Sequence, residues 1–182
     1  MSGEILEVRV SRKLLLILAL VGLLFLVAGI DIGFTNKLIG PEIGQDKPTL
    51  KWIFIGFATA LGGLISVNCF IYLLSPPVML RVTRDKISFG TGFRYNLFDL
   101  PADKLEKVET FMQESAVEVN GKKAIVEGGT AMYFKNSDDI PAQKTTSAGI
   151  QYHGHRLIIS STYSDTGSKE IVERAKAILG LR

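Results

Sequence analysis

The sequence predicts a membrane-anchored α+β protein, in which a two-helix transmembrane hairpin precedes a curled antiparallel sheet or β-barrel of about seven strands capped by a C-terminal α-helix. Three observations support this fold class. Two long apolar runs lie before Pro76-Pro77, apolar residues alternate with period two after it, and the chain ends in a segment of helical periodicity. We therefore expect a hairpin at residues 1–77 and a β domain at residues 78–182.

The two apolar runs have the length of membrane helices. Leu14–Ile30 contains 17 residues and Trp52–Ser75 contains 24, and neither run holds a charged residue. A bilayer core of about 30 Å needs about 20 helical residues. The second run is therefore long enough alone, and the first becomes so if it continues past Asp31 to Phe34. We expect helices at about residues 12–34 and 52–75.

The first apolar run also has features of a signal peptide. Basic residues precede it, and Val27 and Gly29 resemble a loose cleavage site. Two acidic residues in the preceding segment, Glu4 and Glu7, and the length of the run favour a retained helix instead.

The topology follows from the hairpin and from the charges beside it. Three basic residues flank the start of the first helix, three lie between the helices and three follow the second: Arg9, Arg12 and Lys13; Lys37, Lys47 and Lys51; Arg81, Arg84 and Lys86. This distribution gives a weak orientation signal. We expect a multi-pass protein of the bacterial inner membrane, with both termini and the C-terminal domain in the cytoplasm.

Small residues in the second helix indicate a packing face. Ala58, Gly62 and Ser66 recur at four-residue spacing, which would let the first helix approach closely. The residues expected opposite them are Ala19, Gly22 and Gly29. The alternative is that small residues are simply common in membrane helices. Asn68 is a candidate for a hydrogen bond across the hairpin or to a partner subunit.

The segment after the prolines has the pattern of strands. Val78, Leu80 and Val82 alternate with less apolar residues, a turn is expected near Arg84-Asp85, and Ile87 and Phe89 alternate again in a second strand. Further strands are expected in residues 93–100, 104–113, 130–135 and 155–163 and on both sides of Asn120-Gly121, which is a strong hairpin signal. Residues 136–149 are predicted to form an exposed loop.

The chain ends in a predicted amphipathic helix. Its apolar residues recur at i, i+1, i+4, i+7 and i+8: Ile171, Val172, Ala175, Ile178 and Leu179. Ser168 is the predicted N-cap, and Gly180 is predicted to end the helix.

The order of these elements resembles a known fold. The stretch "LRVTRDKISFG…FDLPADKLEKVETF" is similar to the opening of bacterial pleckstrin-homology-like (PH-like) domains. With two membrane helices ahead of it, the whole layout resembles small prokaryotic membrane proteins that carry such a domain. The resemblance implies a binding or scaffolding module rather than a catalyst. The dense basic motif of phosphoinositide-binding relatives is not evident, since the first hairpin offers only Arg81, Arg84 and Lys86.

The motifs of common enzymes and cofactor sites are missing from the sequence. It has no P-loop, no Gly-x-Ser-x-Gly elbow and one cysteine, Cys69. His153 and His155 could share a metal ion, with Asp138 and Asp139 nearby in sequence, but three or four ligands are usually needed. The net charge of +3 is low for a nucleic-acid-binding protein. We therefore expect no enzymatic activity, no cofactor and no metal.

Two hypotheses for binding remain. The first is a protein partner, with the chain acting as an accessory subunit of a membrane complex. The second is recognition of anionic lipid headgroups by Arg81, Arg84 and Lys86, which lie within about ten residues of the predicted membrane helix. The alternative for these three residues is a topology signal and a solvated turn. The absence of a flexible linker at Pro76-Pro77 predicts a domain held close to the bilayer.

Overall fold

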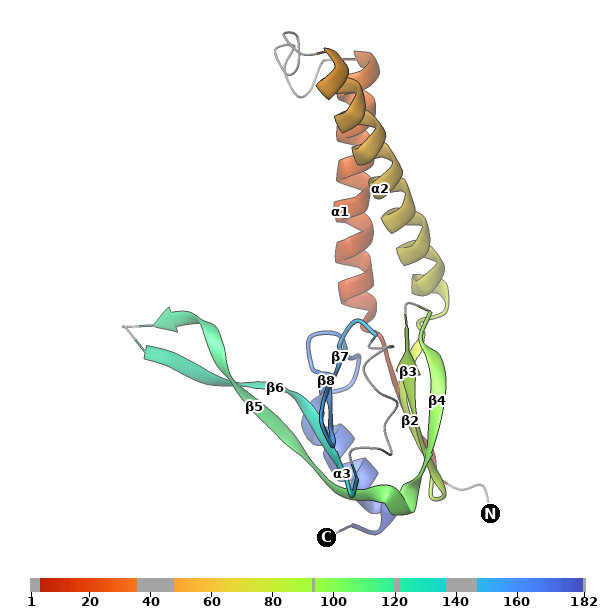
Figure 1. Cartoon of the computed structure of the whole chain (residues 1–182), viewed down its shortest axis with the longest axis vertical. Helices are drawn as coiled ribbons and strands as arrows, with labels where there is room; N and C mark the ends of the chain where they lie inside the picture. Colours follow the sequence, from red (N-terminus) through yellow and green to blue (C-terminus); the bar gives the residue numbers. More distant parts are fainter. Residues whose placement is uncertain (1–3, 36–47, 93, 120–121, 137–146, 182) are drawn as a thin grey trace. The chain divides into compact units, whose positions relative to one another are not determined.

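A computed structural model describes residues 4–35, 48–92, 94–119, 122–136 and 147–181 (Figure 1). The chain forms two compact units. One consists of residues 12–75, and the other combines residues 1–11 with residues 76–182. We refer to them as the helical unit and the β unit.

The helical unit is an α-helical hairpin. α1 (Arg12–Ile30) continues as a π-helical turn, η1 (Asp31–Thr35), so the helix passes Asp31 as predicted. α2 (Pro48–Leu74) begins a few residues before the predicted start. Both helices are long and apolar enough to cross a membrane. Within the described residues, every exposed large apolar side chain except those of Ile5, Leu97 and Met112 lies on this unit.

The β unit contains two four-stranded antiparallel sheets (Figure 1). The first has the order β1-β2-β3-β4, and its strands are β1 (Leu6–Arg9), β2 (Val78–Val82), β3 (Lys86–Thr91) and β4 (Asn96–Pro101). The second has the order β5-β6-β8-β7, and its strands are β5 (Leu105–Val119), β6 (Lys122–Phe134), β7 (Ile150–His153) and β8 (Arg156–Ser160). A short 3-10 turn, η2 (Ala102–Lys104), joins the sheets. The sheets do not close into a barrel in the described chain.

Strand β1 was not among the predicted strands. It pairs antiparallel with β2, with Leu6 opposite Val82 and Val8 opposite Leu80. Leu6 and Val8 are fully buried, whereas Glu7 and Arg9 between them are partly exposed. This alternation is the period-two signal of a half-buried strand. The helical unit is thus an insertion between two neighbouring strands of one sheet, and the β unit begins before the hairpin as well as after it.

The C-terminal helix α3 (Ser168–Leu179) contributes Ile171 and Ala175 to the core and contacts β1, β5 and β6. Gly180 ends the helix in the left-handed conformation, as predicted, with φ 67°. The prediction of Ser168 as N-cap was wrong. Gly167 is the extended N-cap residue, and the Ser168 side chain is the first of the helix and is buried.

Strands β5 and β6 are much longer than their neighbours. The pairing of β6 with β8 covers only Gly129–Tyr133, whereas β5 and β6 remain paired out to Val119 and Lys122. We call residues 112–119 and 122–127 the outer ribbon. Among the described strands, none pairs with either edge of this ribbon, which extends away from the sheets in Figure 1. The predicted turn Asn120-Gly121 itself lies outside the described residues.

Candidate functional site

The candidate site is built around the place where both strands β1 and β2 connect to the helices. The backbone N–H of Val10 donates a hydrogen bond to the carbonyl oxygen of Pro77 at 3.0 Å. The Arg9 guanidinium donates to the carbonyl oxygen of Pro76 at 3.4 Å. The two chain segments that lead to the helices are therefore hydrogen-bonded neighbours. We call this end of the β unit the junction end.

Residues 163–165, which follow β8, contact the segment before α1 at the junction end. Ser11 donates its backbone N–H to the carbonyl oxygen of Tyr163 at 2.7 Å, and Val10 forms a β-bridge with Ser164. Arg9 and Asp165 exchange two hydrogen bonds of 2.9 Å, one from each backbone N–H. The segment that precedes α1 is thus held between β2 and residues 163–165, with no free linker.

The β3–β4 turn lies at the same end of the sheet. Because Leu80 pairs with Phe89 and Thr91 pairs with Asn96, the register places this turn beside the start of β2. Its backbone is unusual, since Tyr95 has φ 52° and donates its N–H to Gly92 at 3.3 Å. A left-handed backbone is costly for a bulky residue and needs surrounding contacts to hold it.

Those contacts come from the segment before β7. The Tyr95 hydroxyl donates to the carbonyl oxygen of Ala148 at 2.8 Å, and the Ser147 hydroxyl lies 2.8 Å from the carbonyl oxygen of Gly90 and 2.9 Å from that of Gly92. Gly90 leaves room for the Tyr95 ring, because a Cβ atom there would lie 2.9 Å from the ring. The turn is therefore held in place on both sides.

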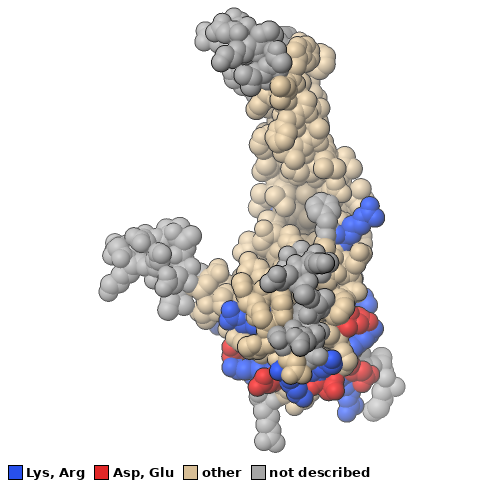
Figure 2. Space-filling view, viewed as in Figure 1, with Lys and Arg blue, Asp and Glu red and all other residues tan. Residues whose placement is uncertain are grey.

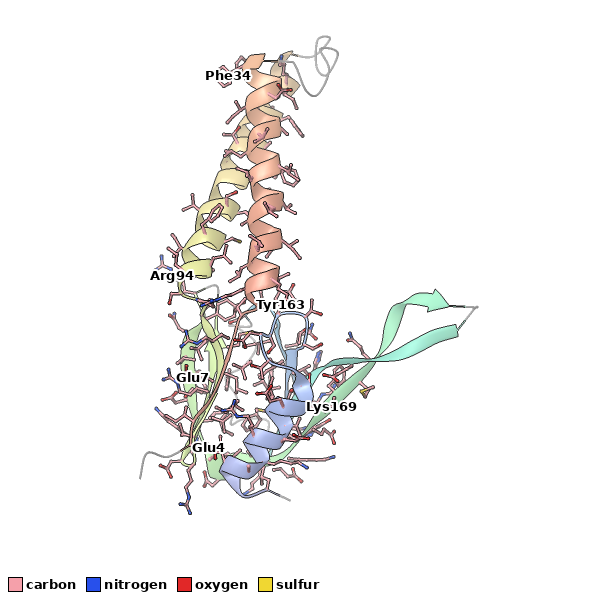
Figure 3. The ribbon with its side chains drawn as sticks, turned by 180° about the vertical axis from the view of Figure 1, so that it is seen from behind. Glu4, Glu7, Phe34, Arg94, Tyr163 and Lys169 are labelled. Carbon is pink, nitrogen blue, oxygen red and sulfur yellow. The ribbon has the colours of Figure 1, made fainter. Side chains whose placement is uncertain are left out.

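Arg94 is the charged residue of this turn. Its side chain is exposed, and no ion pair involving it is found among the described residues. Figure 3 shows Arg94 and Tyr163 at one end of the β unit and Glu4 at the other. The sequence analysis did not select Arg94. The signal that could have found it is the strand register, which places alternate hairpin turns at opposite ends of a sheet.

The basic residues that the sequence analysis selected lie elsewhere. Arg81 bonds Glu7 across the β1–β2 pair, with its Nη2 2.7 Å from the carboxylate, and Lys86 bonds Asp99 across β3–β4 at 2.7 Å. Arg84 is exposed in the β2–β3 turn, at the end of the sheet opposite to the junction end. The structure therefore does not bring these three side chains together as one basic patch.

The neighbouring cations lower the pKa values of both carboxylates, Glu7 and Asp99. The hydrogen bond from Arg9, together with Arg81, lowers the pKa of Glu7 below its ordinary value. The hydrogen bond from Lys86 similarly lowers the pKa of Asp99. Figure 2 shows blue and red side chains interleaved over the β unit. Much of its positive charge is thus matched by adjacent negative charge.

The small residues of α2 lie where the two helices meet. Ala58 is buried, and the Ser66 hydroxyl lies 3.4 Å from the carbonyl oxygen of Ala19. A Cβ atom on Gly62 would lie 2.6 Å from backbone atoms of α1, so only glycine fits there. Asn68 donates instead to the carbonyl oxygen of Leu64 in its own helix, at 2.8 Å, and not across the hairpin.

An open hollow of about 500 Å³ lies at the other end of the β unit. It is lined by Glu4, Arg84 and residues 177–180 of the C-terminal helix region. The lining holds one carboxylate and one guanidinium and no nucleophile with a base beside it.

The two histidines lie at the β7–β8 turn, around Gly154 with φ 62°. His153 pairs through its backbone position with Arg156, and the ring of His155 lies 5.9 Å from that of Tyr133. Within the described part of the chain, no three His, Cys, Asp or Glu residues come together as metal ligands. Asp138 and Asp139 lie outside the described residues.

No protein-family model, no curated protein and no solved structure matches this chain.

Proposed function

We propose that this chain is a non-catalytic binding module, in which the helical hairpin is a membrane anchor and the β unit is a PH-like domain at the cytoplasmic face. The exposed apolar surface of α1 and α2 supports the anchor. Large apolar side chains that face outward along both helices would be covered by lipid in a bilayer and by nothing in water.

The observation that carries the proposal is the insertion of the hairpin between β1 and β2. A flexible linker between the anchor and the domain would let the domain search the space around its anchor. Here the hydrogen bonds at Val10 and Ser11 leave no such linker. A domain attached through two paired strands suits a scaffold that presents one fixed surface to a partner in the same membrane.

Antiparallel strand hairpins followed by a single C-terminal helix support the PH-like assignment, whereas the resemblance also implies a barrel, which the two sheets do not form in the described chain. The protein-binding role is supported by the outer ribbon. Both of its edges carry backbone donors and acceptors that no described strand pairs, and such edges readily accept a strand from a partner. We propose that this partner is a subunit of a larger membrane complex.

Lipid recognition by Arg81, Arg84 and Lys86 is the weaker candidate. Releasing Arg81 from Glu7, or Lys86 from Asp99, to bind a headgroup would only exchange one anion for another. Arg84 lies at the wrong end of the strand, since six residues of extended chain from Val78 cover about 20 Å.

Photo-crosslinking from the full-length chain tests the partner hypothesis. A photoreactive residue in place of Gln113, at the base of the outer ribbon, is expected to crosslink one stoichiometric membrane partner that co-purifies in mild detergent. The same residue in place of Glu173, exposed on α3, is the matched control and is expected to give none. Replacing residues 115–124 by Asn-Gly would shorten the ribbon at the Glu114–Ile125 pair and remove the crosslink.

Absence of a stoichiometric partner would refute the protein-binding role. A partner retained by the shortened chain would place the contact on another surface. Labelling with a membrane-impermeant thiol reagent tests the orientation in a Cys69→Ala background. Lys47→Cys should be reached from outside intact cells, and Lys169→Cys should not; the opposite result would invert the proposed topology.

A further inference from the structure

We propose that Arg94 is a contact for the phosphate groups of anionic lipids, a site distinct from the three basic residues that the sequence suggests. The inference rests on the membrane anchor of the proposed function but not on its protein partner. It depends on three observations, which are the position of the β3–β4 turn, the way the turn is held and the charge around it.

The distance of Arg94 from the end of α2 is limited by covalent geometry and by strand register. Val78 comes four residues after Leu74, the last residue of α2, so the chain can separate them by only about 14 Å. Register places Thr91 beside Val78, at about the 5 Å spacing of neighbouring strands. Arg94 follows Thr91 by three residues, and a long arginine side chain adds further reach. By chain length and register alone, the Cα atom of Arg94 therefore lies within about 30 Å of that of Leu74.

Gly92 and Tyr95, on either side of Arg94, are held by hydrogen bonds. Tyr95, which follows Arg94 directly, is fixed by the Ala148 carbonyl oxygen and by its contact with Gly90, and Ser147 bonds the backbone on the other side. Little conformational freedom of the backbone would be lost when Arg94 binds an anion. Preorganisation of this kind increases affinity because the ordering cost has already been met during folding.

The charge around Arg94 distinguishes it from Arg9 and Arg81, the arginines within the strands of the first sheet. Arg9 and Arg81 are both bonded to the carboxylate of Glu7. The carboxylate of Asp165, at the junction end, accepts a hydrogen bond from the backbone of Arg9. Arg94 has no carboxylate partner among the described residues, so its guanidinium fork is available for a phosphate.

An aromatic side chain at the junction end also supports a contact with lipid headgroups. Tyr163 is half-buried and packs over Gly149, where a Cβ atom would lie 2.4 Å from it. Its carbonyl oxygen bonds Ser11, the residue immediately before α1. Tyrosine is favoured where one face is apolar and the other meets headgroups. The junction end therefore combines an arginine that has no ion pair among the described residues with a half-buried tyrosine.

Hydrogen exchange of the full-length chain in nanodiscs tests the proposal. One preparation contains phosphatidylcholine alone, and the other contains about 30% phosphatidylglycerol, enough to give a strongly negative surface. Peptides covering residues 91–96 are expected to exchange about five-fold more slowly with phosphatidylglycerol, the effect of one headgroup contact. Arg94→Gln should abolish the difference. Arg84→Gln, an exposed turn arginine at the opposite end of the same sheet, is the matched control and should preserve it.

A third arm distinguishes lipid from free phosphate. Adding inorganic phosphate to the phosphatidylcholine nanodiscs should leave the exchange of residues 91–96 unchanged. Equal exchange in both lipids, a difference that survives Arg94→Gln, or protection by inorganic phosphate alone would each overturn the proposal. If the chain does not insert into nanodiscs at all, the membrane anchor itself is wrong; a missing protein partner would leave this experiment unaffected.

Discussion

Replacing Leu6 by alanine tests whether the N-terminal strand is an integral part of the β unit. Leu6 is fully buried in β1, opposite Val82. Truncating a buried leucine to alanine removes its transfer free energy and leaves a cavity, which together cost about 3 kcal/mol in a well-packed core. Because each 1.4 kcal/mol is a tenfold change in an equilibrium constant, the unfolded fraction should rise by about 150-fold.

Hydrogen exchange with mass spectrometry measures this change in the full-length chain in mild detergent. The amides of β2 and β3 exchange only when the sheet opens, so their exchange should accelerate by up to about 150-fold in Leu6→Ala. The matched control is Ile5→Ala, one residue earlier, where the side chain is 52% exposed. Its exchange should change by less than about two-fold.

Equal exchange in the two variants would refute the assignment of β1 to the β unit. The chain would then divide where the sequence analysis placed the boundary, after Pro77. A large change confined to β1 itself would show a fraying strand that does not support the rest of the sheet.

Two further predictions concern the helix interface and the Glu7 ion pairs. Gly62→Leu should prevent close packing of α1 and α2, because its Cβ would overlap backbone atoms, whereas Gly56→Leu in the same helix has open space and should be tolerated. The measurement uses cysteines in place of Ala19 and Ser66, in a chain whose native cysteine is replaced. These cysteines should crosslink in the Gly56→Leu variant and fail to do so in the Gly62→Leu variant. Crosslinking in both variants would contradict the close packing of α1 against α2. Glu7 has a lowered pKa in the folded state, so its contribution to stability is complete above its unfolded pKa and is lost as the pH falls through the folded value. The free energy of unfolding should therefore decline more steeply from about pH 5 to pH 3 in the wild type than in Glu7→Gln, and parallel pH profiles of the two chains would contradict this.

Much of the fold could be predicted because its signals are local. The two helices follow from uninterrupted apolar runs of membrane length, and their ends were placed within a few residues. Strands β2 and β3 follow from alternation on both sides of Arg84-Asp85. The C-terminal helix follows from its apolar face and from Gly180, whose left-handed conformation suits glycine.

Strand β1 was missed although its signal is present. Leu6, Val8 and Val10 alternate with Glu7 and Arg9, which is the same pattern as in β2. Beside a long apolar run, those charged residues were interpreted as the flank of a membrane helix. The strand's partner lies on the far side of the hairpin, and the Glu7–Arg81 ion pair joins residues 74 positions apart. No local pattern identifies such a partner.

The candidate site could not be predicted for a related reason. Proximity to the membrane was judged by distance along the chain, which selects Arg81, Arg84 and Lys86. Strand β2 leads away from the junction end and β3 returns to it, so Arg94 is further in sequence but nearer in register to the start of β2. Only the pairing of β2 with β3 and of β3 with β4 makes this visible.

The inserted hairpin also explains how so distant a strand pair can be stable. Closing a flexible loop of about 64 residues costs about 4 kcal/mol in chain entropy, a large fraction of the stability of a small domain. An antiparallel helix pair returns the chain to its starting side, so packing of α1 on α2 offsets part of that cost. The β1–β2 pair in turn holds the two ends of the hairpin together. Each unit therefore stabilises the other through the chain itself, and a substitution such as Gly62→Leu should accelerate hydrogen exchange in β1 as well as loosen the helices.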